Sequence, residues 1–375
     1  LGFIPGVRDS YRAGRSLVRA GAVSSRVLAR TLETGLEVLE LMGEREDLFR
    51  SSNKKGELLA RWTTLDRETR SFILARMKTR LPELEVARND LHLTREELDD
   101  AFGRTTHPTL QRQKDIFAER LRLAEGWLET FVQGAVLLTS ISDNDGGRVL
   151  LLFLNDDELR PGGGFLGSFG ILTLDAGAVS DLTTYDVMAV DGPVLESRNT
   201  IAPEPLSEYL NVPAWFLRDA NWSPDFAVSS ERTLSFFAEE LKDAGAEAVM
   251  DPNLEIDAVV GLTTSVASDF LSVLGPVEIG EDRFTPQNIA DALENAVQFT
   301  FANRGVTHDR RKDIIQEIVN VMRERFAALT LAEWSKIFTS VAVRLSDKHL
   351  MFFSPNPEVE RLFVRQGWGG RVAEN

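Results

Sequence analysis

Apolar residues recur at intervals of three and four through the first third of the chain. Over residues 8–48 the series is Val18, Ala22, Val27, Leu28, Leu32, Leu36, Leu39 and Met42. It resumes over residues 56–77, 94–102 and 108–140. This spacing is typical of helices that bury one face. The pattern predicts a helical domain over residues 1–144, folded as an antiparallel bundle or a hairpin. The functional interpretation of the same helices is a membrane-proximal stalk.

Local signals refine these helices. Thr94-Arg-Glu-Glu97 resembles a capping box, so a helix is predicted to begin there. Pro108 is predicted to open the last long helix, and no strand pattern precedes residue 147.

The pattern changes at the turn Asp143-Asn-Asp-Gly-Gly147. Residues 149–154 are wholly apolar, which is typical of a strand buried on both faces. Further strands are predicted at 168–174, 179–185, 256–260, 277–279 and 350–353. Helices are predicted at 229–241 with Ser229 as cap, at 263–274, from 285, and at 309–329, 331–343 and 357–366. Strands alternating with helices predict a layered α/β domain over residues 145–375 with a central mixed sheet, and residues 187–227 are predicted to form a long irregular loop.

Composition narrows the classes of function. The net charge of -16 argues against a general nucleic-acid binder and disfavours flat binding to anionic lipid, so an anionic ligand would need a local basic pocket. The absence of cysteine excludes disulfides, thiolate catalysis and Cys-based zinc sites. The 4 histidines do not pair at metal-ligand spacing. No stretch reaches the roughly 18–20 apolar residues that span a bilayer.

The most informative motif is the glycine-rich loop Arg160-Pro-Gly-Gly-Gly-Phe-Leu-Gly-Ser168 between two predicted strands. Glycines allow positive φ and close approach of the backbone to a ligand, and successive amides can bind an anion. Arg160, a candidate catalytic residue, adds a guanidinium fork for phosphate or carboxylate. The candidate ligand-binding residues of the loop are Gly162, Gly163, Gly164 and Ser168. The alternative is a bulged connection in which Arg160 pairs with a nearby carboxylate.

A basic segment, Arg304-Gly-Val-Thr-His-Asp-Arg-Arg-Lys312, precedes a predicted helix. Positive charge in a first turn opposes the helix dipole, so the segment indicates an anionic partner, either a ligand or carboxylates elsewhere in the fold. Arg304 and Arg311 are candidate catalytic residues, and Arg310 is a candidate ligand-binding residue. The alternative is a solvated face.

The predicted long loop carries carboxylates at Asp186, Asp191, Asp219 and Asp225. Paired carboxylates can bind Mg²⁺ or act as acid and base, and Asp186 and Asp191 are the candidate metal ligands. Trp222 is a further candidate ligand-binding residue, because tryptophan near carboxylates is common in sugar sites. The alternative for all of them is loop packing and turn capping.

These motifs carry a family resemblance. Residues 155–170, Asn221-Trp-Ser-Pro-Asp225, residues 256–277 and Asp309-Arg-Arg-Lys312 resemble a bacterial family called domain of unknown function 4012. The resemblance covers roughly residues 145–370. It implies an outward-facing envelope protein that is held in the membrane by a segment before Leu1.

The α/β part also resembles, more distantly, the LytR-CpsA-Psr phosphotransferases. Those enzymes move glycopolymers from a polyprenyl-pyrophosphate carrier onto the cell wall, using arginines and Asp-bound Mg²⁺. The resemblance implies that Arg160, Arg304 and Arg311 clamp pyrophosphate and that Asp186 or Asp191 holds Mg²⁺.

Three functional interpretations follow. In the first, an extracytoplasmic protein binds, and as an enzyme transfers, a polyprenyl-(pyro)phosphate-linked glycopolymer. In the second, a non-catalytic scaffold or interaction module kept the fold; this is favoured because the Arg-x-Asp-Thr motif of those enzymes is here a run of glycines with Ser168. A third interpretation is a carbohydrate-binding module built on residues 215–222. Convergence of Arg160, Arg304 and Arg311 on one pocket would favour the first interpretation, and separate carboxylate partners would favour the second.

Overall fold

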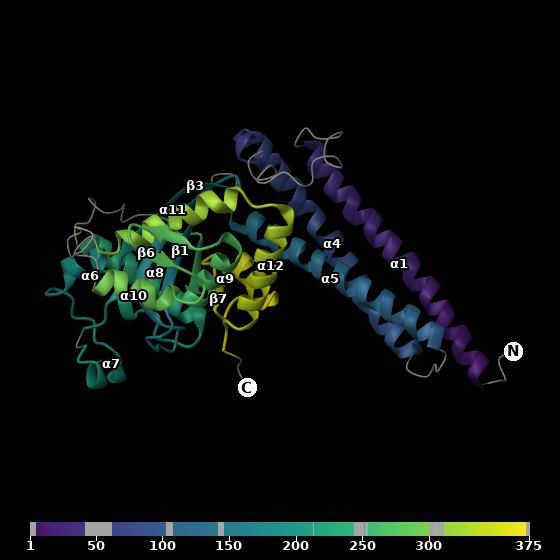
Figure 1. Ribbon diagram of the computed structural model, residues 1–375. Coiled ribbons are helices and arrows are strands. Elements are labelled where there is room, and N and C mark those ends of the chain that lie inside the picture. The colour runs from purple at the N-terminus through teal and green to yellow at the C-terminus, as the bar shows by residue number, and fades with distance from the viewer. Residues whose placement is uncertain are drawn as a thin grey trace. The chain divides into compact units, whose positions relative to one another are not determined.

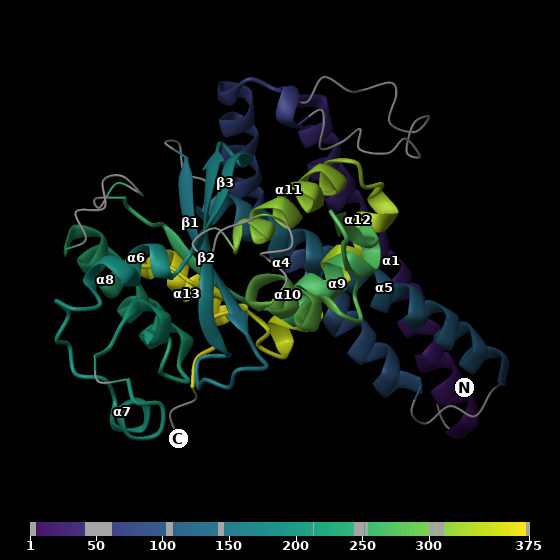
Figure 2. The same cartoon turned by 60° about the vertical axis from the view of Figure 1, so that its left-hand side comes forward.

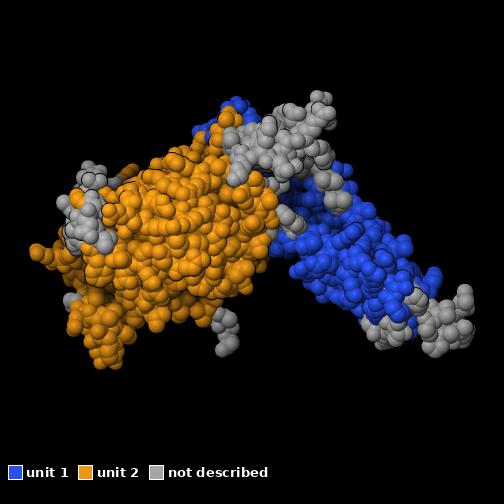
Figure 3. Space-filling model, in the orientation of Figure 1, with its two compact units in different colours: residues 1–51, 65–140 blue, residues 52–64, 141–375 orange. Residues whose placement is uncertain are grey.

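The computed structural model describes residues 5–41, 62–102, 108–141, 146–212, 214–243, 251, 254–299, 305 and 311–372. The chain divides into two compact units (Figure 3). Residues 1–51 and 65–140 form a helical unit, and residues 52–64 and 141–375 form an α/β unit. The predicted fold class is confirmed: a helical N-terminal region is followed by a layered α/β region with a mixed central sheet.

The described residues of the helical unit form three long helices: α1 (Pro5–Leu41), α4 (Arg67–Phe102) and α5 (Pro108–Ile141). Figure 1 shows them running alongside one another. Ion pairs between α1 and α4 show the relative direction of these two helices. Arg19 pairs with Glu97 at 3.6 Å and Glu37 with Arg80 at 3.1 Å, so α1 and α4 are antiparallel. Among the helices that the structure describes, none is long and apolar enough to cross a membrane.

The predicted helix start at Thr94 is wrong, because α4 runs through this residue without a break. The Thr94 hydroxyl donates to the carbonyl oxygen of Asp90 at 2.6 Å, one turn earlier, instead of capping a new helix. Thr94 is buried, and so are Leu91 and Leu98 on the same face. Tertiary packing of this face therefore outweighs the local capping signal.

The α/β unit is built on a five-stranded sheet in the order β3-β2-β1-β4-β7. The strands are β1 (Gly147–Asn155), β2 (Phe165–Asp175), β3 (Ala178–Asp186), β4 (Ala258–Thr263) and β7 (Leu350–Phe353). The pair β1–β4 is parallel, and the remaining pairs are antiparallel. A separate two-stranded sheet joins β5 (Val277–Ile279) to β6 (Asp282–Phe284), a strand that the sequence pattern did not predict.

Helices cover both faces of the sheet (Figure 2). One layer contains α6 (Met188–Val194) and α8 (Phe226–Asp243), and α13 (Pro357–Arg365) packs on β7 through Phe352 and Phe363. The other contains α9 (Thr264–Leu274), α10 (Ile289–Gln298), α11 (Asp313–Ala327) and α12 (Leu331–Ser346). The first layer and the sheet share one core, in which Leu152, Phe169 and Phe237 are buried. Residues of α9, α10 and α11 form a second core with the small sheet.

The predicted loop over residues 187–227 is partly helical. It contains α6, α7 (Glu204–Tyr209) and a 3-10 turn at Leu217–Asp219. Val187, Val190 and Val194 are buried at helical spacing, a short apolar pattern that the abundance of Pro and Asn obscures. The Ser229 cap is also wrong, because α8 begins at Phe226 and Asp225 Oδ1 accepts from the Ala227 amide at 3.0 Å.

Candidate functional site

A cavity of about 400 Å³ opens in the α/β unit where β1 and β2 meet α10 and α11. This volume lies within the range of small-molecule sites, roughly 300–1,000 Å³. Much of its wall is apolar, from Phe153, Leu154, Phe165, Leu293, Val297 and Ile315. The polar lining residues include Asn155, Glu158, Ser168, Thr264, Glu294, Gln298, Arg311 and Lys312. An apolar wall with a few charged groups suits a ligand that is itself amphipathic.

Lys312 is the basic group that the sheet fixes most firmly. It lies just before α11, and its ammonium group is 2.9 Å from Asp186 Oδ1 on β3 and also donates to the carbonyl oxygen of Gly167. Burial lowers the pKa of Lys312, and the nearby Asp186 carboxylate opposes that shift. The predicted metal ligand Asp186 thus has a cationic partner beside the cavity.

The glycine-rich loop owes its composition to close packing within the protein. Gly163 and Gly164 have φ values of 104° and 133°, which L side chains rarely adopt. A Cβ at Gly164 would overlap the carbonyl oxygen of Asn155, and a Cβ at Gly162 would overlap that of Asn221. Asn221 Nδ2 also donates to the Gly164 carbonyl oxygen at 2.8 Å. These contacts account for the glycines without a ligand, and anion binding by the loop amides stays a prediction.

Arg160 pairs with a carboxylate, although not with one in its own loop. Its Nε lies 3.3 Å from Asp219 Oδ1, and its guanidinium stacks 5.2 Å from the centre of the Phe165 ring. Asp219 is 2% exposed and accepts through its backbone carbonyl from Trp215 Nε1 at 2.8 Å. Arg160 is not among the described residues that line the cavity.

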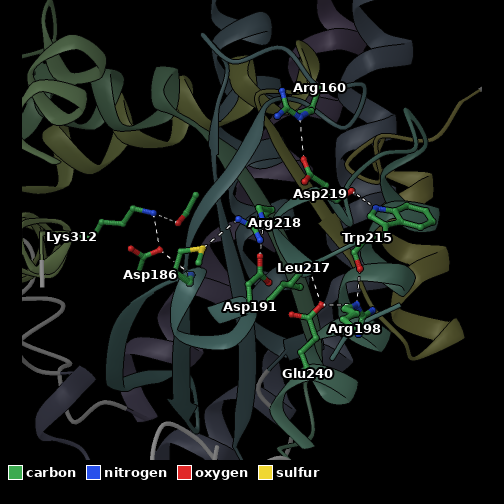
Figure 4. A network of polar contacts seen from close by, with 12 residues as sticks. Arg160, Asp186, Asp191, Arg198, Trp215, Leu217, Arg218, Asp219, Glu240 and Lys312 are labelled. Carbon is green, nitrogen blue, oxygen red and sulfur yellow. Dashed lines mark hydrogen bonds and ion pairs between the residues drawn. The ribbon is translucent and has the colours of Figure 1, made fainter. Parts of the chain in front are cut away.

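A second charged group lies in the interior beside α6 and α8 (Figure 4). Arg218 Nε is 2.9 Å from Asp191 Oδ2, and Arg198 Nε is 3.2 Å from Glu240 Oε1. The carboxyl groups of Asp191 and Glu240 are neighbours (Figure 4), and the Asp191 carboxyl group contributes to raising the pKa of Glu240. Burial raises both of their pKa values, that of Glu240 to about 9.

The predicted site residues therefore do not gather in one place. Ser168 and Arg311 line the cavity, whereas Arg160 and Asp191 belong to separate buried ion pairs. Trp222 is half-buried and is not among the cavity residues described. Arg304 and Arg310 lie outside the described residues.

No three His, Cys, Asp or Glu side chains within the described part of the chain are grouped as metal ligands would be. Asp186 faces Lys312, and Asp191 faces Arg218, so a cation already neutralises each carboxylate. The arrangement of these carboxylates does not fit Mg²⁺, and Mg²⁺ binding stays a prediction.

Sequence reasoning missed Lys312 as a cavity residue and missed Glu240, Arg198 and Arg218 altogether. A signal existed for Glu240, because it follows Phe236 and Phe237 on the buried face of α8. A charged residue at an apolar helical position indicates a buried partner.

Residues 145–297 match the family model described as Protein of unknown function (DUF4012). This part of the chain is similar to that family. The match to DUF4012 runs from the start of β1 to α10, so it covers the glycine-rich loop, Asn221 and much of the cavity wall. Arg311 and Lys312 come after the matched residues. A search of curated proteins found no match. The distant resemblance to the LytR-CpsA-Psr enzymes stays a prediction.

Proposed function

We propose that this protein binds a polyprenyl-phosphate-linked glycopolymer, with the phosphate and the first isoprene units in the cavity between β2, α10 and α11. The observation that carries the proposal is the combination of an apolar wall with Lys312 and Arg311 on the α11 side. Apolar surface is favourably removed from water by an isoprenoid, and a phosphate gains charge-assisted hydrogen bonds from ammonium and guanidinium groups.

The size of the cavity restricts which part of the ligand it holds. A volume of about 400 Å³ accommodates a short isoprenoid segment and a phosphate. The remaining lipid and the glycan would extend outside. In this proposal the protein acts on the outer side of the membrane, where such lipid-linked glycans are presented to the wall.

Binding without transfer is the form of the function that the geometry favours. Arg160 and Asp191, expected at a reaction centre, are each engaged in buried ion pairs. A scaffold that presents the lipid-linked polymer to another protein needs only the cavity. Transfer would require a further group that activates the acceptor hydroxyl.

Binding is tested by thermal shift of the full chain with farnesyl phosphate, with farnesol and inorganic phosphate as the two half-ligands. A ligand that binds only the folded state raises the melting temperature. We expect a shift with farnesyl phosphate that exceeds those with either half-ligand.

Two variants locate the binding. Val297→Trp fills the apolar end, and Arg311→Gln removes one positive charge from the polar lining. Both should reduce the shift, whereas Arg283→Gln on β6, which is exposed, should retain it. No shift with well-folded protein at millimolar ligand would reject the lipid phosphate and favour a protein-binding scaffold.

A further inference from the structure

The first helix carries a continuous stripe of arginines. Arg12, Arg15, Arg19, Arg26 and Arg30 are all exposed. Since each helical residue advances about 100°, these positions fall within an arc of about 60° on α1. No Asp or Glu occurs between residues 10 and 32, so the acidic residues of α1 nearest to the stripe are Asp9 and Glu33 at its two ends.

The stripe borders an exposed apolar edge. Tyr11 is 71% exposed and Val18 is 76% exposed. On the helical projection they lie beside the arginines and opposite Ala13, Ala20 and Val27, the residues that α1 buries in its own unit. The outward side of α1 thus combines arginines with an aromatic and an aliphatic side chain.

The arginines have little compensation from the rest of their unit. Among the described residues, Arg19 pairs with Glu97 at 3.6 Å, and both side chains are more than half exposed. Such exposed pairs hold their charges weakly. The stripe therefore remains accessible to an external anionic surface.

The net charge of the chain does not argue against binding of α1 to an anionic surface. The helical unit holds 20 basic and 20 acidic residues, so the whole excess of -16 belongs to the α/β unit. The argument from net charge against flat binding to anionic lipid therefore applies to the α/β unit and not to α1.

We propose that the outward side of α1 is a docking surface for an anionic phospholipid bilayer. Guanidinium groups bind lipid phosphates, and Tyr11 and Val18 enter the headgroup region beside them. Basic side chains bordering exposed apolar residues are the composition of helices that lie in a membrane interface. A nucleic acid would bind the arginines but would leave Val18 exposed to water. A lipid surface would contact both the arginines and the apolar residues of this side of α1.

The proposal is tested by co-sedimentation of the full chain with phosphatidylcholine vesicles, with and without phosphatidylglycerol. We expect binding only with phosphatidylglycerol, weakening as salt screens the charges. Arg15→Gln/Arg26→Gln should lower the partition coefficient about fivefold per arginine, hence about 25-fold. The control Arg112→Gln/Arg120→Gln removes two exposed arginines from α5 and should bind as wild type.

Three outcomes would overturn the proposal: no binding to anionic vesicles, equal loss in the two double variants, or binding to duplex DNA in place of vesicles. Circular dichroism establishes that each variant is folded. The Arg15/Arg26 variant should also keep its thermal shift with farnesyl phosphate. Loss of the thermal shift alone would contradict the proposed binding in the cavity. Loss of vesicle binding alone would concern the proposed surface on α1.

Discussion

Asp191 on α6 and Glu240 on α8 lie beside each other in the interior of the α/β unit, where neither side chain is exposed (Figure 4). Burial and the neighbouring Asp191 carboxyl group raise the pKa of Glu240, which favours the protonated form of Glu240. Arg218 and Arg198 flank the pair, and the Leu217 amide donates to Glu240 Oε1 at 2.9 Å. The pair thereby ties α6, α8 and the turn at Leu217 together.

Glu240→Gln should keep the protein folded and remove most of its pH sensitivity above neutrality. The pKa of Glu240 is raised from 4.5 to about 9 in the folded protein, so the folded state keeps a proton that the unfolded state has released. The wild-type free energy of unfolding therefore falls as pH rises from 4.5 towards about 9. Urea denaturation across this range measures the slope. The slope should persist in the exposed α8 variant Glu231→Gln, and an undiminished slope in Glu240→Gln would show that the pair does not hold the proton.

Asp219→Ala should destabilise the α/β unit strongly. Asp219 is 2% exposed and Arg160 is 15% exposed, so the substitution leaves a guanidinium buried without its carboxylate. Breaking such a pair costs about 3–5 kcal/mol. The loss is measured by urea denaturation, with Glu278→Ala in an exposed pair with Arg283 as the control that should change nothing measurable. Equal stability of Asp219→Ala and wild type would mean that solvent reaches Arg160.

Gly164→Ala should be much more harmful than Gly280→Ala. Both glycines have positive φ, so alanine is strained at each position. At Gly164 the new Cβ would also overlap the Asn155 carbonyl, whereas nothing lies within 4 Å at Gly280. Melting temperatures of the two variants separate the backbone strain from the overlap. Similar losses at both positions would show that the loop can move away from β1.

Most of the fold could be predicted from the sequence, because the periodicity of hydrophobic residues indicates which side chains are buried. The apolar run at Val149–Leu154 lies in β1, which is buried between two helical layers as the run predicts. Errors occurred where local signals compete with packing. Thr94 resembles a cap but lies inside α4, and α6 is too short for its valines to stand out among polar residues.

The contacts of the candidate site could be predicted less well, because its ion pairs join residues that are far apart in the sequence. In the alternative to ligand binding, Arg160 pairs with a nearby carboxylate, yet its partner Asp219 is 59 positions away. Lys312 pairs with Asp186, which lies 126 positions earlier in the sequence. Sequence identifies a charged residue but not the carboxylate that the fold places beside it.

Asp186→Asn should make stability depend on pH in the opposite direction to the Asp191–Glu240 pair. Lys312 is 15% exposed, and burial already lowers its pKa from 10.5. Removing the carboxylate 2.9 Å away lowers it further, so the folded state binds a proton less readily than the unfolded state. The variant should therefore lose about 3 kcal/mol near neutral pH and recover part of that loss as pH rises towards 10.5.

Urea denaturation at neutral and alkaline pH measures this recovery. Asp181→Asn, an exposed change on the same strand, should show no recovery. Adding Lys312→Met to Asp186→Asn removes the unpaired charge, so the double variant should be more stable than Asp186→Asn alone. If the double variant were less stable, Lys312 would be stabilised mainly by its hydrogen bond to the Gly167 carbonyl, and Asp186 would remain available to another cation at the cavity.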